Sequence, residues 1–286
     1  MATLPQKARA LVGNSAMRRA YSRWLWSKLM AGRPPRLQII NDIEIGEWIN
    51  FSEYWSFQSG LGRKEELFAR RCLSSIGFKA VSFDVGANLG IFACALASLG
   101  SREVHAFEPI PQTFCRLHAN VSHNGLFDRC HLNCLAVSDN PGLVTFRVQA
   151  ASPATNRLSV GQFVPPSGKS EWCQTVAATT LDQYCAAKGV QSIDFLKIDV
   201  EGMEPCVLRG ARELLAGKRI RTILIEMCPG NLAAVGMGVH CLFEAICTHS
   251  YIPFALTAKG ELGSRLDEAD FHRIVIDNVA LLPEAP

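Results

Sequence analysis

The sequence lacks the features of a membrane-spanning, secreted or disulfide-bonded protein. No run approaches the ~18–20 apolar residues that a helix needs to cross a bilayer. The first residues show no clean apolar core followed by a small-residue cleavage site, so we expect no secretory signal. Eleven cysteines are scattered through the chain, an odd number with no C-x-x-C spacing. We therefore expect reduced thiols and a cytoplasmic protein.

The sequence also lacks the G-x-G-x-x-G motif that holds the pyrophosphate of a dinucleotide. The nearest stretch is "FDVGANLGIF" over residues 83–92, where an apolar run is followed by a turn. Gly86 permits a tight turn and Gly90 permits a close approach of the backbone. Asn88 stands where the dinucleotide motif needs its second glycine, so a pyrophosphate has less room. A plain strand-to-helix turn capped by Asn88 is an equal interpretation of this stretch alone.

Acidic residues are absent from the first 41 residues, which hold eight basic ones. The rest of the chain has 21 basic and 26 acidic residues, a balance of −5, although the whole chain has a net charge of +3. A mildly acidic body disfavours nucleic acid as a partner. Within the basic arm, Met17, Tyr21, Trp24 and Leu25 fall on one helical face, and "GRPPR" ends the pattern.

Three interpretations of this amphipathic pattern stay open. Residues 1–33 could make a peripheral contact with a membrane or with an acidic partner. An acid-poor, arginine-rich start also suits an organelle-targeting peptide, and a helix packed on the main domain is the third interpretation. We expect the aromatic stretch 51–62 to be a loop or lid. The chain is therefore divided into a basic N-terminal extension, residues 1–60, and one domain, residues 61–286.

Strand and helix patterns alternate after the extension, in a chain with 48% hydrophobic and 19% charged residues. The patterns predict helices over 63–76, 89–99, 112–124, 181–187, 203–215 and 239–250. They predict strands over 81–85, 103–107, 130–137, 193–200, 220–227, 251–256 and 274–282. The strand-like region 142–179 interrupts the alternation and is interpreted as an insertion that could shape a substrate pocket. Repeated strand–helix units imply an α/β fold with a mostly parallel sheet and helices on both faces.

Acidic side chains stand at the ends of four predicted strands, where an open α/β sheet binds its ligands. These residues are Asp84, Glu108, Asp199 and Glu226. Glu108 follows Gly86 by 22 residues, near the spacing at which an acid accepts the hydroxyls of a ribose. A carboxylate there also repels a phosphate on the ribose. Turn and acid together favour an adenosine-containing ligand, and Asn88 favours one that lacks a pyrophosphate. The cluster of carboxylates suits a cationic ligand or a metal.

The stretch "IDFLKIDVEGMEP", residues 193–205, places Lys197 and Asp199 on the same side of a strand. Charged side chains in an apolar central strand are costly unless they are paired or used. Glu201 and Glu204 follow, at the start of a predicted helix. Acids are favoured at a helix N-terminus, which explains Glu204 without any chemistry but leaves Lys197 unexplained.

At this point the sequence resembles the FkbM-type S-adenosylmethionine-dependent methyltransferases. The matching stretches are "FDVGANLGIF", "FEPIPQTFCRLHANVSHNG", "TTLDQY", "IDFLKIDVEGMEPCVLRGA" and "ILIEM", in that order. The resemblance covers about residues 81–227 and leaves residues 1–60 and "GNLAAVGMGVH" without a counterpart. It implies a class I methyltransferase fold, a seven-stranded Rossmann-like sheet whose last strand is antiparallel. It also implies S-adenosyl-L-methionine as cofactor and a hydroxyl of a small metabolite, sugar or glycan as the methyl acceptor.

The strand-end residues fit this cofactor, which offers a ribose diol to Glu108 and a sulfonium cation to the carboxylates. We assign the cofactor to Asp84, Gly86, Asn88, Gly90, Glu108, Ala136 and Val137. Asp199 is expected nearest the reacting centre, with Lys197 orienting it or favouring its ionised form and Glu201 as a second acid. No histidine has ligand-like spacing, so we assign no metal, although a divalent ion held by Asp199, Glu201 or Glu226 stays open. We expect His105 and His131 to be strand residues and His240 to lie near the mouth of the pocket.

Two other functions compete with methyl transfer. One is an NAD-dependent oxidoreductase on the same kind of sheet, against which Asn88 argues. The other is a non-catalytic, membrane-associated protein of methyltransferase fold, supported only by the basic arm and the aromatic stretch. The sequence does not predict the identity of the acceptor or the oligomeric state.

Overall fold

The computed structural model describes residues 36–48, 63–149, 157–158 and 171–284. The expected amphipathic helix of the basic arm and the aromatic stretch 51–62 lie outside these residues. All eleven cysteines lie within them and are free thiols, four of them buried. Among the described helices, none is both long enough and apolar enough to cross a membrane.

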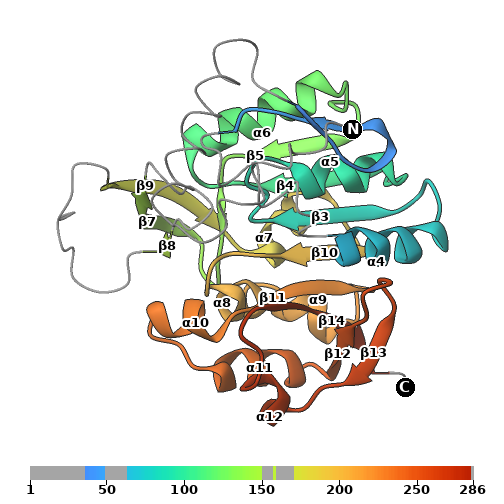
Figure 1. The fold of residues 1–286 in the computed structure, drawn as a ribbon. Helices are drawn as coiled ribbons and strands as arrows, with labels where there is room; N and C mark the ends of the chain where they lie inside the picture. The colour runs from blue at the N-terminus through green and yellow to red at the C-terminus, as the bar shows by residue number, and fades with distance from the viewer. Residues whose placement is uncertain (1–35, 49–62, 150–156, 159–170, 285–286) are drawn as a thin grey trace, which may run out of the picture.

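One eight-stranded sheet organises the described residues, in the order β13-β12-β14-β11-β10-β3-β4-β5 (Figure 1). In chain order its strands are β3 (Val81–Val85), β4 (Glu103–Phe107), β5 (Cys130–Asn133), β10 (Phe195–Ile198), β11 (Ile223–Met227), β12 (Tyr251–Leu256), β13 (Leu262–Arg265) and β14 (Asp277–Pro283). The strands from β5 to β11 pair in parallel, and β14 is antiparallel to both β11 and β12. The predicted α/β class and the antiparallel last strand are confirmed. The predicted count of seven is exceeded by β13, a short strand that pairs with β12 at the edge.

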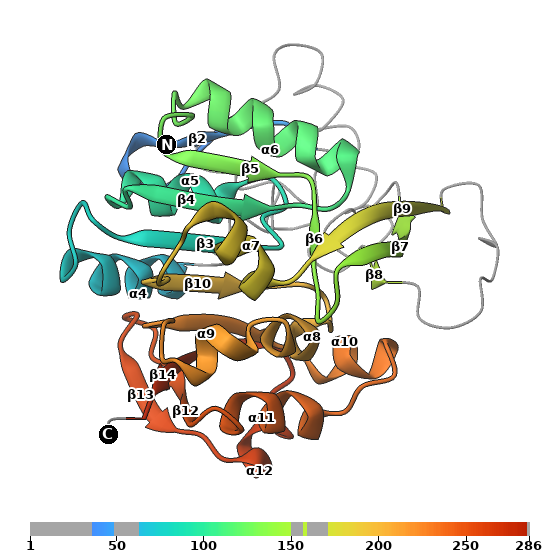
Figure 2. The same ribbon diagram turned by 180° about the vertical axis from the view of Figure 1, so that it is seen from behind.

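Helices cover both faces of this sheet, as expected, and each face has its own apolar core. On one face lie α4 (Arg63–Ser74), α5 (Ile91–Ser98) and α6 (Pro111–His123). On the other lie α7 (Leu181–Lys188), α8 (Glu204–Arg209), α9 (Arg212–Ala216) and α11 (Val239–Cys247), with α12 (Glu268–Phe271) against α11 (Figure 2). The predicted helix 203–215 is divided into α8 and α9 at Gly210 and Ala211. A Cβ at Gly210 would lie 2.0 Å from the carbonyl oxygen of Ser138, so glycine allows the chain after β6 to pass close to this break.

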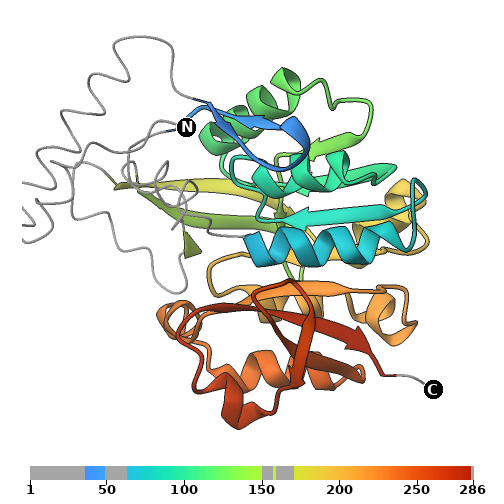
Figure 3. The same ribbon diagram turned by 45° about the vertical axis from the view of Figure 1, so that its right-hand side comes forward.

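Residues 36–48 pack on the α5/α6 side of the domain. They form a hairpin of β1 (Leu37–Gln38) and β2 (Glu44–Ile45), joined by a short 3-10 helix, η1 (Ile40–Asp42) (Figure 3). Asn120 of α6 accepts a hydrogen bond from the backbone of Gly46 and donates one to the carbonyl oxygen of Leu89, both at 2.9 Å. This part of the expected extension is therefore joined to the loop that precedes α5.

The insertion after β5 forms a second sheet, beyond the carboxyl ends of the central strands (Figure 2). Its order is β6-β9-β7-β8, with β6 (Ala136–Val137), β7 (Gly142–Gln149), β8 (Arg157–Leu158) and β9 (Glu171–Thr179). The prediction of one continuous strand over 130–137 was wrong, because β5 ends at Asn133 and the chain then crosses to this second sheet. Ala136 and Val137 pair with β9 rather than extending the third strand.

Candidate active site

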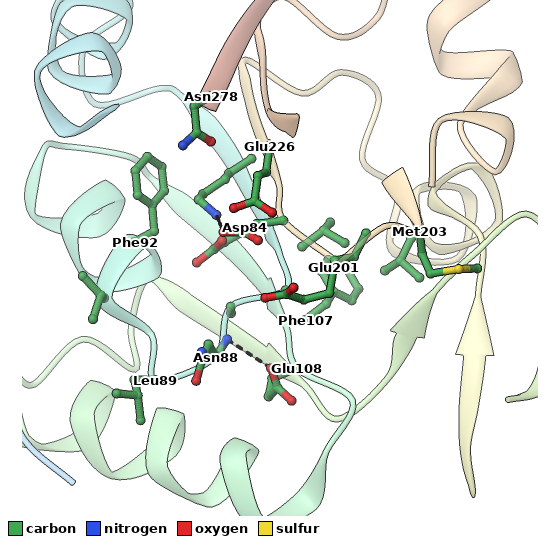
Figure 4. A pocket seen from close by; sticks show the side chains of 18 of the residues that line it. Asp84, Asn88, Leu89, Phe92, Phe107, Glu108, Glu201, Met203, Glu226 and Asn278 are labelled. Atoms are coloured by element: carbon green, nitrogen blue, oxygen red, sulfur yellow. Dashed lines mark hydrogen bonds and ion pairs between the residues drawn. The ribbon is translucent and has the colours of Figure 1, made fainter. Parts of the chain in front are cut away.

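A pocket of about 840 Å³ opens at the carboxyl ends of β3, β4, β10 and β11 (Figure 4). This volume is in the range of small-molecule sites. All but one of the residues assigned from the sequence line it: Asp84, Gly86, Asn88, Glu108, Ala136, Val137, Lys197, Asp199 and Glu201. The exception is Gly90, which faces α6.

The turn between β3 and α5 forms one wall, and its glycines serve packing. A Cβ at Gly86 (φ 84°) would lie 1.8 Å from the carbonyl oxygen of Asp199, so only glycine lets β10 end this close to β3. A Cβ at Gly90 (φ 81°) would lie 2.4 Å from Cδ1 of Leu117 on α6. The close approach that glycine permits at position 90 is, in this structure, to a helix.

Asn88 does not cap α5, whose N-cap is Gly90 without a side-chain hydrogen bond. The backbone of Asn88 is left-handed (φ 49°), and its N–H donates to Oε2 of Glu108 at 3.1 Å. Its side-chain oxygen is buried and has no hydrogen-bond partner among the described residues. The capping interpretation was wrong, and this amide oxygen is available to a donor on a ligand.

Glu108 follows β4 directly and is only 6% exposed. Its Oε1 accepts the backbone N–H of Ile110 at 2.9 Å, while Oε2 accepts that of Asn88. Burial raises the pKa of Glu108 to about 7, although these two N–H groups oppose the shift. Each carboxylate oxygen can accept a second hydrogen bond, so a fixed pair of acceptors lines the pocket.

Asp84 is fully buried, and neither of its carboxylate oxygens accepts a well-formed hydrogen bond from the described residues. It is the register partner of Lys197 on β10. Burial raises the pKa of Asp84 to about 6, with the charge of Lys197 opposing that shift and Asp199 adding to it. A buried carboxylate without donors is costly in isolation, and a ligand with a positive charge would relieve that cost.

Lys197 and Asp199 form an ion pair at the end of β10. The Lys197 ammonium lies 2.8 Å from Oδ2 of Asp199 and 5.5 Å from the centre of the Phe92 ring on α5. The Lys197 side chain is 10% exposed and that of Asp199 is 33% exposed. Burial lowers the pKa of Lys197, but the charges of Asp199, Asp84 and Glu226 raise it by more, so the amine stays charged.

Three further acids lie near this pair. Asn231, in α10 (Pro229–Ala234), donates from Nδ2 to Glu201 at 2.8 Å and to Glu226 at 3.4 Å. Burial raises the pKa of Glu226 to about 8, and the neighbouring charges of Asp199 and Glu201 add to the shift. Glu204 accepts the backbone N–H groups of Val200 and Gly202. The structural interpretation of Glu204 is thus confirmed, whereas no sequence pattern indicated Asn231.

The second sheet supplies apolar walls of the pocket, as expected for the insertion 142–179, although Val144 and Phe146 were not singled out from the sequence. Val144 and Phe146 of β7 line the pocket beside Leu135, Ala136 and Val137. At the mouth, the side chain of Ile276 is 60% exposed. The pocket therefore combines these apolar side chains with the acids Asp84, Asp199 and Glu226.

The histidines named from the sequence lie away from the pocket. His105 and His131 are strand residues, as predicted. Burial and the neighbouring His131 lower the pKa of His105 to about 4, so its imidazole is neutral. His240 was expected near the mouth of the pocket, but it is an exposed residue of α11 that pairs with Glu268 at 2.8 Å.

The sheet order, the helices on both faces and the acids at neighbouring strand ends define a Rossmann-like fold of the class I methyltransferase type. Residues 84–253, more than half of the chain, match the Methyltransferase FkbM domain. The chain therefore belongs to the FkbM methyltransferase family, and the resemblance seen in the sequence is confirmed.

Three curated relatives share this part of the chain. The chain is 29% identical to the 2-O-methyltransferase NoeI of Sinorhizobium fredii over 49% of its own length and 60% of that protein. It is 31% identical to the 31-O-demethyl-FK506 methyltransferase FkbM of Streptomyces tacrolimicus over 57% and 72% of the two chains. It is 25% identical to the hexuronic acid methyltransferase AglP of Haloferax volcanii over 72% of its own length and 80% of that protein. The match to NoeI spans less than two thirds of that protein. Family membership removes the oxidoreductase alternative.

Proposed function

We propose that this protein is an S-adenosylmethionine-dependent O-methyltransferase acting on a hydroxyl of a small metabolite, sugar or glycan. The observation that carries the proposal is the pair of buried acids Asp84 and Glu108 at adjacent strand ends of one pocket. Glu108 offers two oriented acceptors, and Asp84 accepts no well-formed hydrogen bond from the described residues. A ribose diol and a sulfonium cation would satisfy these two groups.

The residues of the pocket fit this cofactor better than a dinucleotide. Glu108 would hold the ribose hydroxyls, Asp84 would face the cationic portion, and the apolar Ala136 and Val137 would flank the adenine. The acids Asp84 and Asp199 by themselves outnumber the cation of Lys197, which favours a positively charged ligand. When bound, S-adenosylmethionine supplies an electrophilic methyl group.

Asp199 is our candidate for the group that handles the acceptor proton. Methyl transfer needs the acceptor oxygen aligned with the methyl group and its proton removed. Asp199 is the more exposed member of the ion pair, so it can reach an acceptor while Lys197 fixes its orientation. Glu201, held by Asn231, would act as the second acid. The apolar walls from β7 would exclude water.

Both an apolar and a polar acceptor are compatible with the mouth of the pocket. Ile276, Val144 and Phe146 offer apolar contacts, whereas Arg63 and Lys64 of α4 offer cations. The relatives' names include a methyltransferase for 31-O-demethyl-FK506 and one for a hexuronic acid. We therefore propose a small-molecule or saccharide hydroxyl as the acceptor, without choosing between these classes.

Two measurements test the proposed function. In a thermal-shift comparison, S-adenosylmethionine or S-adenosylhomocysteine should stabilise the full chain and NAD should not. A ligand at 100 times its Kd adds about 2.7 kcal/mol to the free energy of unfolding. Transfer of labelled methyl groups to a panel of hydroxylated acceptors then tests turnover. The absence of stabilisation by both S-adenosyl compounds would contradict the proposal. Binding without transfer to any acceptor would favour the non-catalytic alternative.

A further inference from the structure

Three potential metal ligands meet on the α7 face of the central sheet. Glu103 and His105 lie on β4 and His131 on β5, and one ligand atom of each lies within 4.8 Å of those of the others. His105 and His131 are direct register partners on these parallel strands. Glu103 precedes His105 by two residues and therefore points to the same side of the sheet. Strand pairing thus brings together residues that no sequence spacing connects.

A chain of hydrogen bonds determines which nitrogen of His105 carries the proton. Asn133 donates from Nδ2 to the carbonyl oxygens of Ala106 and His131, so its Oδ1 is an acceptor. The Tyr184 hydroxyl donates to that oxygen at 3.2 Å. Having given its one proton, the hydroxyl oxygen accepts from Nδ1–H of His105, 2.9 Å away. The lone pair of His105 is therefore on Nε2.

This lone pair lacks a donor. The His105 side chain is 4% exposed, and its Nε2 has no hydrogen-bond partner among the described residues. It lies 3.6 Å from Oε2 of Glu103, beyond hydrogen-bond distance, while Oε1 of Glu103 is paired with Arg102 at 3.0 Å. The His131 ring stacks on that of His105 at 4.8 Å. A buried nitrogen lone pair close to a carboxylate oxygen is electrostatically unfavourable, and a cation bound between them would relieve this.

We propose that Glu103, His105 and His131 bind a divalent transition-metal ion, with Zn²⁺ as the probe. Two imidazoles and one carboxylate are a recurrent zinc ligand set, and water completes the coordination. The hydrogen bond from His105 to Tyr184 is the kind of outer contact that fixes the orientation of a metal-bound imidazole. His131 is exposed on the edge strand β5, which gives the ion a route from solvent.

This metal site is separate from the methyl-transfer pocket. Glu103 begins β4 and Glu108 follows its end, so the two acids stand about 16 Å apart along the strand direction. The two sites also differ in chemistry, since the described residues that line the pocket present carboxylates, two lysines and an arginine but no imidazole. The proposed ion joins β4 to the edge strand β5 and has no part in methyl transfer.

The test compares Zn²⁺ binding to the full chain and to its His131→Ala variant by isothermal titration calorimetry, with the thiols kept reduced. His131 is exposed, so the variant should unfold at the wild-type temperature in the presence of a chelator. We expect the variant to bind one Zn²⁺ fewer per chain, or to bind it about tenfold more weakly or worse. Glu103→Gln should have the same effect. His272→Ala, which removes an exposed histidine elsewhere, should match the wild type.

A cobalt titration separates this site from one made by the cysteines. Co²⁺ bound by imidazole and carboxylate should give visible bands without sulfur-to-metal charge transfer, and these bands should be lost in His131→Ala. Equal stoichiometry and affinity of Zn²⁺ in His131→Ala and the wild type would overturn the proposal. A wild-type spectrum dominated by thiolate charge transfer, or no Zn²⁺ bound by the wild type, would also overturn it.

Discussion

Lys197 donates a 2.8 Å hydrogen bond to Asp199 from a buried position between β3 and β11. The lysine is also the register partner of Asp84, so one cation serves two acids of different exposure. Asp84 is fully buried, whereas Asp199 is one-third exposed toward the pocket. The same lysine can thus stabilise a buried carboxylate and orient one that reaches the ligand. Replacing Asp199 and replacing Lys197 should therefore have different effects on stability.

Replacing Glu108 tests the ribose contact. Glu108→Ala should weaken the binding of S-adenosylhomocysteine by roughly 10²–10⁴-fold, because two hydrogen bonds to a carboxylate are lost at ~1.5–3 kcal/mol each. Calorimetry measures the Kd, and Glu213→Ala, at an exposed acid of α9, serves as the control. An affinity that stays within about threefold of the wild type would remove Glu108 from the binding residues.

Replacing Gly86 tests the packing of β3 against β10. The added Cβ of Gly86→Ala would meet the carbonyl oxygen of Asp199, which cannot move without shifting β10. We expect a loss of about 2–5 kcal/mol, from the left-handed backbone and from overpacking together. Gly125 has a similar φ of 64° but nothing within 4 Å of an added Cβ. In urea unfolding, Gly125→Ala should therefore lose only about 1–2 kcal/mol of the free energy of unfolding. Equal losses of stability in Gly86→Ala and Gly125→Ala would contradict this account.

The regular part of the fold was predictable from the sequence because its strands are short apolar runs bounded by turns. β3 and β4 have the predicted bounds, and α4 to α7 begin and end within a few residues of them. The division of 130–137 was not predictable, because the residues on both sides of the break are strand formers. Only the tertiary structure shows that the chain changes sheets there. β13 and α10 were missed because both are short elements, and the exposed residues of β13 carry no apolar pattern.

The acids of the pocket were predictable because strand ends in a parallel sheet share one edge. The contacts that each of these side chains makes were not predictable. Asn88 looked like a helix cap, yet its backbone binds Glu108 and its side-chain oxygen is left for a ligand. The group of Glu103, His105 and His131 depends on the register of β4 with β5, which joins residues 26 positions apart.

The buried acid Glu226 makes stability depend on pH. Its pKa in the folded chain, about 8, is raised from 4.5, so its contribution to stability is full below about pH 4.5 and is lost as pH rises through about 8. The Glu226→Gln variant has no titrating group at this position. Its free energy of unfolding should equal that of the wild type near pH 4 and exceed it near pH 8, by on the order of 1 kcal/mol or more. Urea unfolding at the two pH values measures this, with Glu213→Gln as the control for a lost surface charge. A difference that does not grow with pH would contradict the assignment.

Deleting the basic arm tests the proposed peripheral membrane contact. A chain without residues 1–33 should bind S-adenosylhomocysteine as the full chain does, because the described residues that line the pocket all lie beyond them. Its binding to vesicles of anionic lipid at low salt should fall, since each basic residue near such a surface adds about 1 kcal/mol. Co-sedimentation measures the binding, and neutral vesicles are the control. Equal sedimentation of both chains would favour the alternatives without a membrane contact.

The sharpest prediction concerns Asp199. Asp199→Asn keeps the shape of the side chain and removes its charge. If Asp199 accepts the acceptor proton or positions the reacting groups, turnover should fall by roughly 10²–10⁴. The Kd of the cofactor should change much less, because Glu108 and the adenine-flanking residues lie on other strands. Lys197→Met should lower turnover too and should also destabilise the fold by about 3 kcal/mol, because it leaves Asp84 buried without a cation.

A purely structural ion pair would behave differently, and the same strand offers a control. At the other end of β10, Asp194 lies 3.6 Å from Arg221 and accepts the backbone N–H of Val81, away from the pocket. Asp194→Asn should cost stability but leave turnover per folded molecule near the wild-type value. Turnover is measured at saturating cofactor and divided by the folded fraction from unfolding curves, so that stability and chemistry are separated. If Asp199→Asn behaves like Asp194→Asn, losing stability but keeping its turnover, the Lys197–Asp199 pair stabilises the sheet and the proton acceptor is another group. If only Asp199→Asn loses turnover while both fold, the charge of Asp199 acts on the reaction.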